Sequence, residues 1–225
     1  MPNNFKKTTL TPALSQRRGG FTLAEVLITL VIIGVIAAIT VPTLMNKTNN
    51  QEYVSRLKKA YSTLSQVTNK IIADNGIPRG SDWTISVDSV YNMYKKYLVN
   101  AKECSHDSGC FSQKTYKFLN GDDNPDNFDE HWGWQKLILA DGTQVMFHSA
   151  SNECQGNSHC ARIYVDINGV KKPNKYGRDL FVFALREQSL LPYGCGDNIS
   201  DNCNAGDNHG HTCACKVLRE GAMNY

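Results

Sequence analysis

The chain has 225 residues and a formal net charge of +3, and its length suits one ordinary domain with an appendage. Apolar and charged fractions of 41% and 20% are those of a folded protein and exclude a wholly disordered chain. The charge is uneven, because the first twenty residues hold no acid and four basic residues, Lys6, Lys7, Arg17 and Arg18. Without these four, 20 basic residues face 21 acidic ones, a formal −1. Bulk charge therefore gives no indication of a nucleic-acid partner.

An apolar run of 21 residues, Phe21 to Val41, follows the basic flank and carries one charge, that of Glu25. As a helix the run spans roughly 30 Å, about the hydrocarbon thickness of a bilayer. The basic flank predicts a cytoplasmic N-terminus, with everything after Val41 outside the cytoplasm. A carboxylate in such a segment costs about 2.5 to 3.5 kcal/mol on insertion scales, so Glu25 needs a role or a partner.

Three interpretations of this segment compete. A cleaved secretory signal has a shorter apolar run with its small-residue cleavage site behind it, whereas here Gly19-Gly20 comes before the run. A plain membrane anchor leaves Glu25 unexplained. The third interpretation rests on the stretch RRGGFTLAE, residues 17–25, which closely resembles the class III signal of type IV prepilins and type II secretion pseudopilins.

That resemblance implies that a membrane-embedded prepilin peptidase cuts after Gly20 and then N-methylates Phe21. It also implies that Glu25 acts in subunit assembly. Chemically, a carboxylate in an apolar bundle can pair with the terminal amine of a neighbouring subunit, which neutralises two costly charges. Thr22 and Thr29 are expected to hydrogen-bond back to their own helix.

The pattern becomes amphipathic from Gln51 to Asp74, with apolar side chains recurring at three and four residues. Gly76 and Pro78 then form a stop signal. We predict one helix from Phe21 to Asn75, about 80 Å long, whose second half lays an apolar stripe on a sheet. The expected organisation is a cleaved leader at 1–20, the long helix at 21–75 with its transmembrane part at 21–41, and an extracytoplasmic pilin-like head at 76–225.

The head is predicted to begin with a second helix from Ser86 to Val99. Strands are predicted at Trp134–Ala140 and Thr143–His148, joined by the hairpin signal Asp141-Gly142, and at Arg162–Ile167, while Leu180–Leu185 is a further strand or a short helix. Together these elements predict an α+β fold. In it the long helix packs on a small antiparallel sheet of three or four strands with disulfide-rich loops.

All eight cysteines lie in the head: Cys104, Cys110, Cys154, Cys160, Cys195, Cys203, Cys213 and Cys215. This clustering favours an oxidising compartment, in which disulfides are the first expectation. The first four fall into two pairs with equal spacing, each enclosing a small polar loop. Cys213 and Cys215 are too close to pair comfortably with each other. Each would reach back to Cys195 or Cys203, and the choice between these partners stays open.

Metal ligation is the rival explanation. Zinc ligand types occur at His209, His211, Cys213 and Cys215, with Cys195 and Cys203 nearby, but the spacing matches no standard zinc module. Two oxygen-rich sets, Asp122/Asp123/Asp126 and Asp197/Asp201/Asp207, are candidates for calcium, which some pseudopilin heads bind. Neither set follows the EF-hand spacing, and solvated turns explain both better. We therefore expect no cofactor and assign no metal ligands, with calcium kept as an alternative.

The sequence holds no G-x-S-x-G, H-E-x-x-H or phosphate-loop motif, so we expect a protein that is not an enzyme. The resemblance implies a structural subunit, single-pass in the inner membrane with its head outside, that polymerises into a type II secretion pseudopilus or a type IV pilus. The implied partners are the prepilin peptidase, other pilin or pseudopilin subunits, an inner-membrane assembly platform and membrane lipid. The stretch from Val165 to Asp179 is also similar to pseudopilin-type heads, which favours secretion.

Two alternatives belong to other classes of protein. One is a membrane-anchored extracytoplasmic binding protein that never polymerises; it predicts that Glu25→Val leaves function intact, whereas the filament hypothesis predicts failed assembly. The other is an anchored enzyme using the cysteine-rich head, but no set of residues motivates it.

Overall fold

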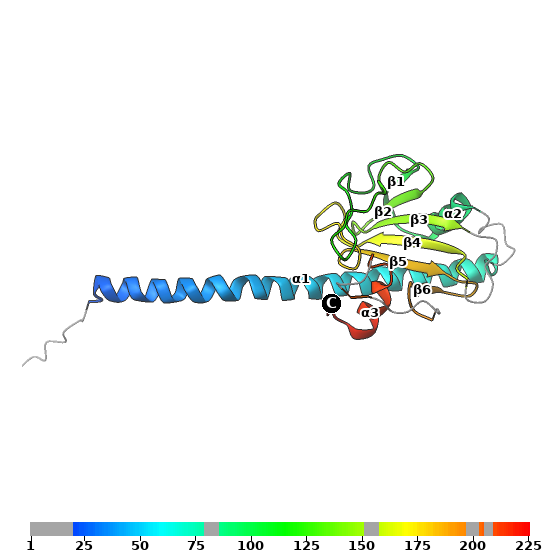
Figure 1. The fold of residues 1–225 in the computed structure, drawn as a ribbon. Helices are drawn as coiled ribbons and strands as arrows, with labels where there is room; N and C mark the ends of the chain where they lie inside the picture. The colour runs from blue at the N-terminus through cyan, green and yellow to red at the C-terminus, as the bar shows by residue number, and fades with distance from the viewer. Residues whose placement is uncertain (1–19, 79–85, 151–157, 197–202, 205–208) are drawn as a thin grey trace, which may run out of the picture. The chain divides into compact units, whose positions relative to one another are not determined.

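The computed structural model describes residues 20–78, 86–150, 158–196, 203–204 and 209–225 (Figure 1). It divides into two compact units, Met1–Met45 and Asn46–Tyr225. The first helix, α1, is Leu23–Asn75; it begins in the first unit, ends in the second and has Pro42 inside it. Nineteen of the twenty residues of the expected leader, 1–19, lie outside the described residues.

The part of α1 in the first unit is apolar on all sides. Between Phe21 and Met45 its large apolar side chains are 44–89% exposed. A helix with this surface is stable only where another apolar phase surrounds it, which means a bilayer or a helix bundle. Within the described part of the chain, α1 is long and apolar enough to cross a membrane, judged by length and composition.

The second unit is built on a six-stranded antiparallel sheet in which the strands follow one another in chain order. The strands are β1 Asn100–Ser105, β2 Gln135–Leu139, β3 Gln144–Ala150, β4 Ala161–Asp166, β5 Leu180–Leu185 and β6 Leu190–Pro192. The predicted α+β fold with a long N-terminal helix is thus confirmed. The predicted number of strands is wrong, because two edge strands were missed: β1 is polar and largely exposed, and β6 has three residues and ends in a proline.

The predicted hairpin at Asp141-Gly142 joins β2 to β3. Its turn closes through a hydrogen bond from the Gly142 N–H to the Leu139 carbonyl at 2.9 Å. Gly142 has φ +85°, a left-handed conformation that favours glycine. The turn therefore sets the register in which Leu137 lies opposite Val145.

One face of the sheet packs on helices. α1 contributes the stripe that begins at Val54 and includes the fully buried Leu57, Leu64 and Ile71. Two short helices add to this core: α2 is Val87–Tyr97, with Ser86 as its N-cap, and α3 is Cys213–Glu220. The second helix was predicted at nearly these bounds, whereas α3, with two cysteines in its first turn, was not. This helix face is mainly aliphatic and follows the periodicity of the sequence.

The opposite face of the sheet is also buried, under the connection of residues 106–134 between β1 and β2. Its core is mainly aromatic and includes Phe111, Tyr116, Phe128, Trp134, Tyr164 and Tyr176. Tyr116 and Phe128 lie 4.9 Å apart, measured between ring centroids. We call this side the loop face, and the other side the helix face.

Candidate processing and assembly site

The start of α1 brings the residues of the predicted signal together. Because the helix begins at Leu23, Thr22 stands at the N-cap and Glu25 at the third helical position. Glu25 Oε2 accepts hydrogen bonds from the Thr22 backbone N–H and the Thr22 hydroxyl, each at 2.8 Å. In return, the Glu25 backbone N–H donates to the Thr22 hydroxyl at 3.2 Å. This reciprocal pair is a capping box, and it satisfies helix-terminal donors that lipid leaves unpaired.

The expectation that Thr22 hydrogen-bonds back to its own helix is confirmed, and its partner there is Glu25. Thr29 also bonds back to its own helix, at 2.9 Å from the Val26 carbonyl. The pattern Thr-x-x-Glu at residues 22–25 carried the signal for the capping box. Glu25 is thus already tied at Oε2, while its Oε1 accepts no hydrogen bond from any described residue.

Gly20 and Phe21 precede the helix in irregular backbone. Among the described residues, nothing lies within 4 Å of the position that a Cβ of Gly20 would occupy. The Phe21 side chain is 89% exposed. Nothing in the described part of the chain therefore shields the peptide bond between Gly20 and Phe21 from a second protein that approaches the N-terminal end of the helix.

The cysteines of the head form disulfides. Three pairs lie within the described residues: Cys104–Cys110, Cys195–Cys215 and Cys203–Cys213. Cys160 is also disulfide-bonded, while Cys154 lies outside the described residues. Of the arrangements that the sequence left open, the structure has the nested one, in which Cys215 reaches back to Cys195 and Cys213 to Cys203.

The residues considered for zinc are engaged elsewhere. All four of their cysteines are in the two nested disulfides. The His209 ring lies 4.3 Å from Phe118 and the His211 ring 4.6 Å from Tyr176, measured between centroids. Burial lowers the pKa of His211 to about 4, so this ring stays neutral and packs as part of the loop face.

Of the two acidic sets considered for calcium, only the first lies within the described residues, and its side chains and backbone are engaged in local contacts. Asp123 pairs with Lys117 at 2.8 Å, and Asp122 accepts a hydrogen bond from Asn120 at 2.7 Å. The Asp126 backbone N–H donates to the Asn124 side chain at 3.1 Å, which is local turn geometry. The other set, Asp197, Asp201 and Asp207, lies outside the described residues. Among the residues that are described, no three His, Cys, Asp or Glu side chains are placed to hold a metal.

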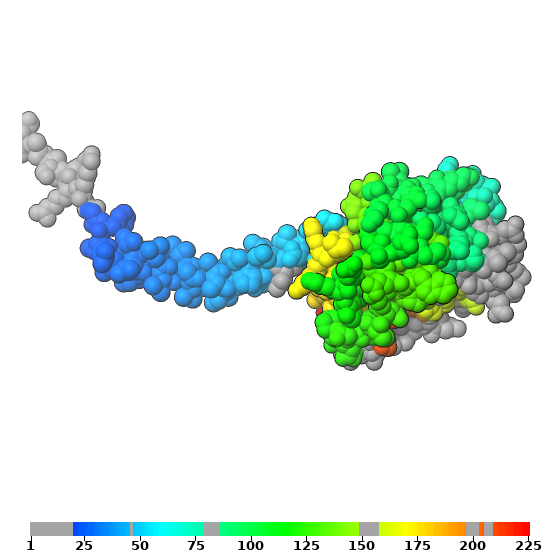
Figure 2. All heavy atoms as spheres, turned by 90° about the horizontal axis from the view of Figure 1, so that it is seen from above, coloured from blue at the N-terminus to red at the C-terminus, as the bar shows by residue number. Residues whose placement is uncertain are grey.

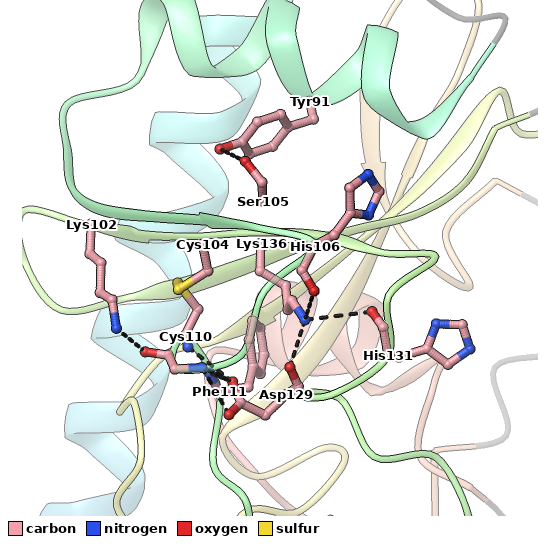
Figure 3. The surroundings of a disulfide bond; sticks show 11 residues. Tyr91, Lys102, Cys104, Ser105, His106, Cys110, Phe111, Asp129, His131 and Lys136 are labelled. Atoms are coloured by element: carbon pink, nitrogen blue, oxygen red, sulfur yellow. Dashed lines mark hydrogen bonds between the residues drawn. A yellow bond between two sulfur atoms is a disulfide. The ribbon is translucent and has the colours of Figure 1, made fainter.

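The Cys104–Cys110 disulfide closes a loop over a buried carboxylate, that of Asp129 (Figure 3). This carboxylate accepts hydrogen bonds from three consecutive backbone N–H groups, those of Gly109, Cys110 and Phe111, at 2.8–2.9 Å. Three converging amide dipoles stabilise a buried anion that has no exposed surface.

A buried lysine of β2 holds the other side of the same connection. The Lys136 ammonium, 0% exposed, donates to three carbonyl oxygens: Asp129 at 2.6 Å, His106 at 3.2 Å and His131 at 3.5 Å (Figure 3). Burial lowers the pKa of Lys136, and the nearby carboxylates of Asp129 and Asp107 oppose that shift. The three ammonium protons thus meet three acceptors, and residues 106–131 are fastened to the sheet.

The stretch from Val165 to Asp179, whose sequence resembles pseudopilin-type heads, runs from the end of β4 through the connection to β5. Two buried carboxylates, those of Asp166 and Asp179, fix this connection. Asp166 accepts hydrogen bonds from the Tyr116 hydroxyl at 2.6 Å and from two turn N–H groups at 3.0 Å. Asp179 accepts hydrogen bonds from the Asn174 and Lys175 N–H groups at 2.7 and 2.6 Å. Burial raises the pKa of both carboxyls, that of Asp179 to about 6, and the Asp179 charge adds to the shift at Asp166.

Glycine is needed in this connection at position 177. A Cβ there would lie 2.9 Å from the Cys213 sulfur, and φ is +74°. The aspartates and this glycine therefore serve the fold of the connection, and their pattern is explained by turn geometry and close packing.

Two family models match the chain. The prokaryotic N-terminal methylation motif matches residues 15–41, which include Gly20, Phe21 and Glu25; it is the class III signal of type IV pilin-like proteins. A family of unknown function, DUF6613, matches residues 43–194, from the middle of α1 to the turn after β6. No curated protein and no solved structure matches. The apolar helix and this signal fit a membrane-anchored, pilin-like protein, and the chain belongs to the DUF6613 family.

Proposed function

We propose that this chain is a structural subunit of a type II secretion pseudopilus or a type IV pilus. Prepilin peptidase cuts it between Gly20 and Phe21 and methylates the new amine, and the mature chain then polymerises through the N-terminal half of α1. The observation that carries the proposal is the match to the methylation motif over residues 15–41, at a helix start where Gly20 and Phe21 are open to another protein.

Glu25 has the geometry that assembly needs. Its Oε2 is bound by Thr22, which fixes the carboxylate at the helix terminus. Its Oε1 accepts nothing from the described residues and is the acceptor for the Phe21 amine of a neighbouring subunit. In an apolar surrounding such a pair neutralises two charges that are each costly alone. The pair forms only when the two helices have the correct axial offset, so it also sets the register of the filament.

The exposed apolar surface of α1 supports the transfer from bilayer to filament. Between Phe21 and Met45 no large apolar side chain is less than 44% exposed. Association in a bundle exchanges lipid contacts for helix contacts at little net hydrophobic change, so polar pairs such as Glu25 and the amine decide the balance. The mature subunit waits as a single-pass protein of the inner membrane with its head outside, where an assembly platform extracts it.

The head suits exposure outside the cytoplasm, because its loops are tied by disulfides that persist only in oxidising compartments. The loop face adds buried hydrogen-bonded charges at Asp129 and Lys136 to this covalent framework. A head fixed in this way suits a structural role in a filament.

Peptide mass spectrometry of the native N-terminus tests the proposal. Sheared surface material and the membrane fraction are compared, and a methylated peptide that begins at Phe21 is expected. Its recovery in sheared material favours a surface pilus, and its confinement to the membrane fraction favours a pseudopilus or an unassembled pool. An intact leader, or a cut at another residue, would contradict the proposal.

One observation favours the second candidate, an anchored binding protein that never polymerises. Trp132 is 79% exposed on the head. Tryptophan is enriched among the residues that carry most of the binding energy in protein contacts. The two candidates separate on Glu25→Val, which abolishes assembly of a filament subunit and leaves an anchored binder functional.

A further inference from the structure

A basic pocket lies where the connection between β4 and β5 meets α1. It is a cavity of about 510 Å³, lined on the helix by Asn49, Asn50 and Tyr53 and on the connection mainly by Lys172, Lys175 and Arg178. Figure 2 shows the connection, in yellow, against the part of α1 near residue 50. Three cations and three neutral polar side chains thus surround a space large enough for a phosphate group.

The cations of this pocket have no carboxylate partner among the described residues, where the ion pairs involve other lysines and arginines and one histidine. The described residues that line the pocket include no acidic side chain. Gathering three like charges on a fixed frame is unfavourable until an anion enters between them. The pocket therefore carries a positive charge that no described carboxylate compensates, as an anion-binding site does.

Hydrogen bonds hold the backbone and one cation of the pocket in place. The Arg178 guanidinium donates to Asn50 Oδ1 at 3.0 Å and lies 5.8 Å from the centre of the Tyr225 ring. The backbone N–H of Lys175 is held by Asp179, and the carbonyl of Lys172 accepts a hydrogen bond from Asn168 at 3.2 Å. Both lysines therefore project from a connection whose backbone is already held by hydrogen bonds. This lowers the conformational entropy that is lost when a ligand binds.

The position in the chain points to the source of the anion. Asn49 follows Val41, the last residue of the apolar run, by eight helical residues, or roughly 12 Å at the rise of an α-helix. Lysine and arginine side chains lay their aliphatic stems along apolar surface and keep their charged ends among polar groups such as headgroups. Val170, 66% exposed, stands beside Lys171 and Lys172. An exposed apolar side chain followed by lysines suits the boundary between headgroups and acyl chains.

We propose that this pocket binds the phosphate of an anionic phospholipid headgroup. Its placement beside a bilayer rests on the proposed function, whereas its charge and geometry do not. A bound headgroup orients the head of the unassembled subunit on the membrane surface. Free inorganic phosphate shares the same chemistry, and an acidic segment of a neighbouring subunit is a different partner; both are outcomes of the test.

The test uses the full chain in a neutral maltoside detergent, with native mass spectrometry to count bound lipid. Phosphatidylglycerol and phosphatidylcholine are titrated separately, and inorganic phosphate is added as competitor. The pocket variant is Lys172→Gln/Lys175→Gln/Arg178→Gln. The matched control, Lys70→Gln/Lys96→Gln/Lys114→Gln, makes the same change in net charge at exposed lysines outside the pocket.

One phosphatidylglycerol is expected to bind the wild-type chain and the control with equal affinity. The pocket variant is expected to bind it on the order of 100-fold more weakly, because each cation near an anionic headgroup contributes about 1 kcal/mol. Should the triple variant misfold by thermal unfolding, the single change of the exposed Lys172 to Gln is expected to weaken binding about five-fold.

Four results would overturn the proposal. Unchanged lipid affinity in the pocket variant, or equal binding of the two lipids, removes the pocket as a headgroup site. Displacement of the lipid by an equal concentration of inorganic phosphate reassigns the pocket to a free anion. A lipid-free dimer that the pocket variant loses reassigns it to a second subunit. None of these readouts requires cleavage at Phe21 or polymerisation, so the filament proposal stands or falls separately.

Discussion

The two faces of the head sheet are buried by different kinds of structure. The helix face is covered by regular elements whose aliphatic side chains recur at helical and strand spacing, as at Leu57 and Leu64. The loop face is covered by the irregular connection of residues 106–134, with an aromatic core and two buried charged groups, Asp129 and Lys136. Hydrophobic periodicity therefore explains how the helix face is buried. Hydrogen bonds between the backbone and buried charged groups explain how the loop face is buried.

Removing the buried cation should have the largest effect on the head. Lys136→Met takes away the donor to three carbonyl groups and leaves the Asp129 carboxylate without a nearby positive charge. We expect a loss of about 4 kcal/mol in the free energy of unfolding, measured by chemical denaturation of the full chain in detergent with near-ultraviolet circular dichroism. The control Lys117→Met, at an exposed ion pair with Asp123, should change little. If Lys136→Met leaves the free energy of unfolding unchanged, packing alone holds the loop face.

On the helix face, Leu57→Ala is expected to destabilise the head by about 3 kcal/mol. Leu57 is 0% exposed, so the change removes apolar contacts and leaves a cavity between α1 and the sheet. The same denaturation measurement applies. A loss clearly larger than that of Lys136→Met would show that the aliphatic layer dominates the stability of the head.

The double change Cys104→Ser/Cys110→Ser should cost less, about 2 kcal/mol, because the disulfide closes a short loop. The Asp129 carboxylate still gathers the three backbone N–H groups of that loop, so residues 106–134 should stay folded. Hydrogen exchange of the Cys110 and Phe111 amides checks this. Complete loss of protection would show that the disulfide, and not the buried carboxylate, holds the loop.

Acid should weaken the loop face through its histidines. Burial lowers the pKa of His148 and of His211 from about 6.5 to about 4. The unfolded chain therefore binds protons first, so the stability is complete above pH 6.5 and is lost as the pH falls toward 4. Asp179 acts in the opposite direction, because its pKa is raised from 3.8 to about 6 and its contribution is lost as the pH rises through that window.

Asp166, whose pKa burial also raises, acts in the same direction as Asp179, so removing one histidine is needed to isolate the histidine contribution. His148→Gln is expected to remove about 2 kcal/mol of the pH dependence that the histidines cause. Denaturation series at pH 7 and pH 4, on the wild type and the variant, measure it. Parallel curves for the two proteins would contradict the assignment of the pH dependence to His148.

The sequence predicted the helix face better than the loop face, for physical reasons that particular residues show. The stripe of α1 and the Asp141-Gly142 turn are local signals, and each alone indicates its element. A lysine within a strand, as at Lys136, normally marks a solvent-facing position; its burial depends on carbonyl groups supplied by distant loop residues. β1 and β6 lack alternation and exist because β2 and β5 offer them an edge. The processing residues were predicted from their motif, while the pairing of Thr22 with Glu25 was not.

The smallest expected effect lies at the N-terminus of α1, where neither face of the head takes part. Thr22→Val keeps the backbone N–H that donates to Glu25 Oε2 and removes the hydroxyl that donates to the same oxygen. A lost cap is worth about 1 kcal/mol, so we expect a roughly five-fold lower ratio of assembled to membrane-held subunit, while methylation at Phe21 and the stability of the head stay unchanged. Thr22→Ser restores the hydroxyl and should restore the ratio. If Thr22→Val instead assembles as well as the wild type, the carboxylate does not depend on its capping partner, and register in the filament must come from the Glu25–amine pair alone.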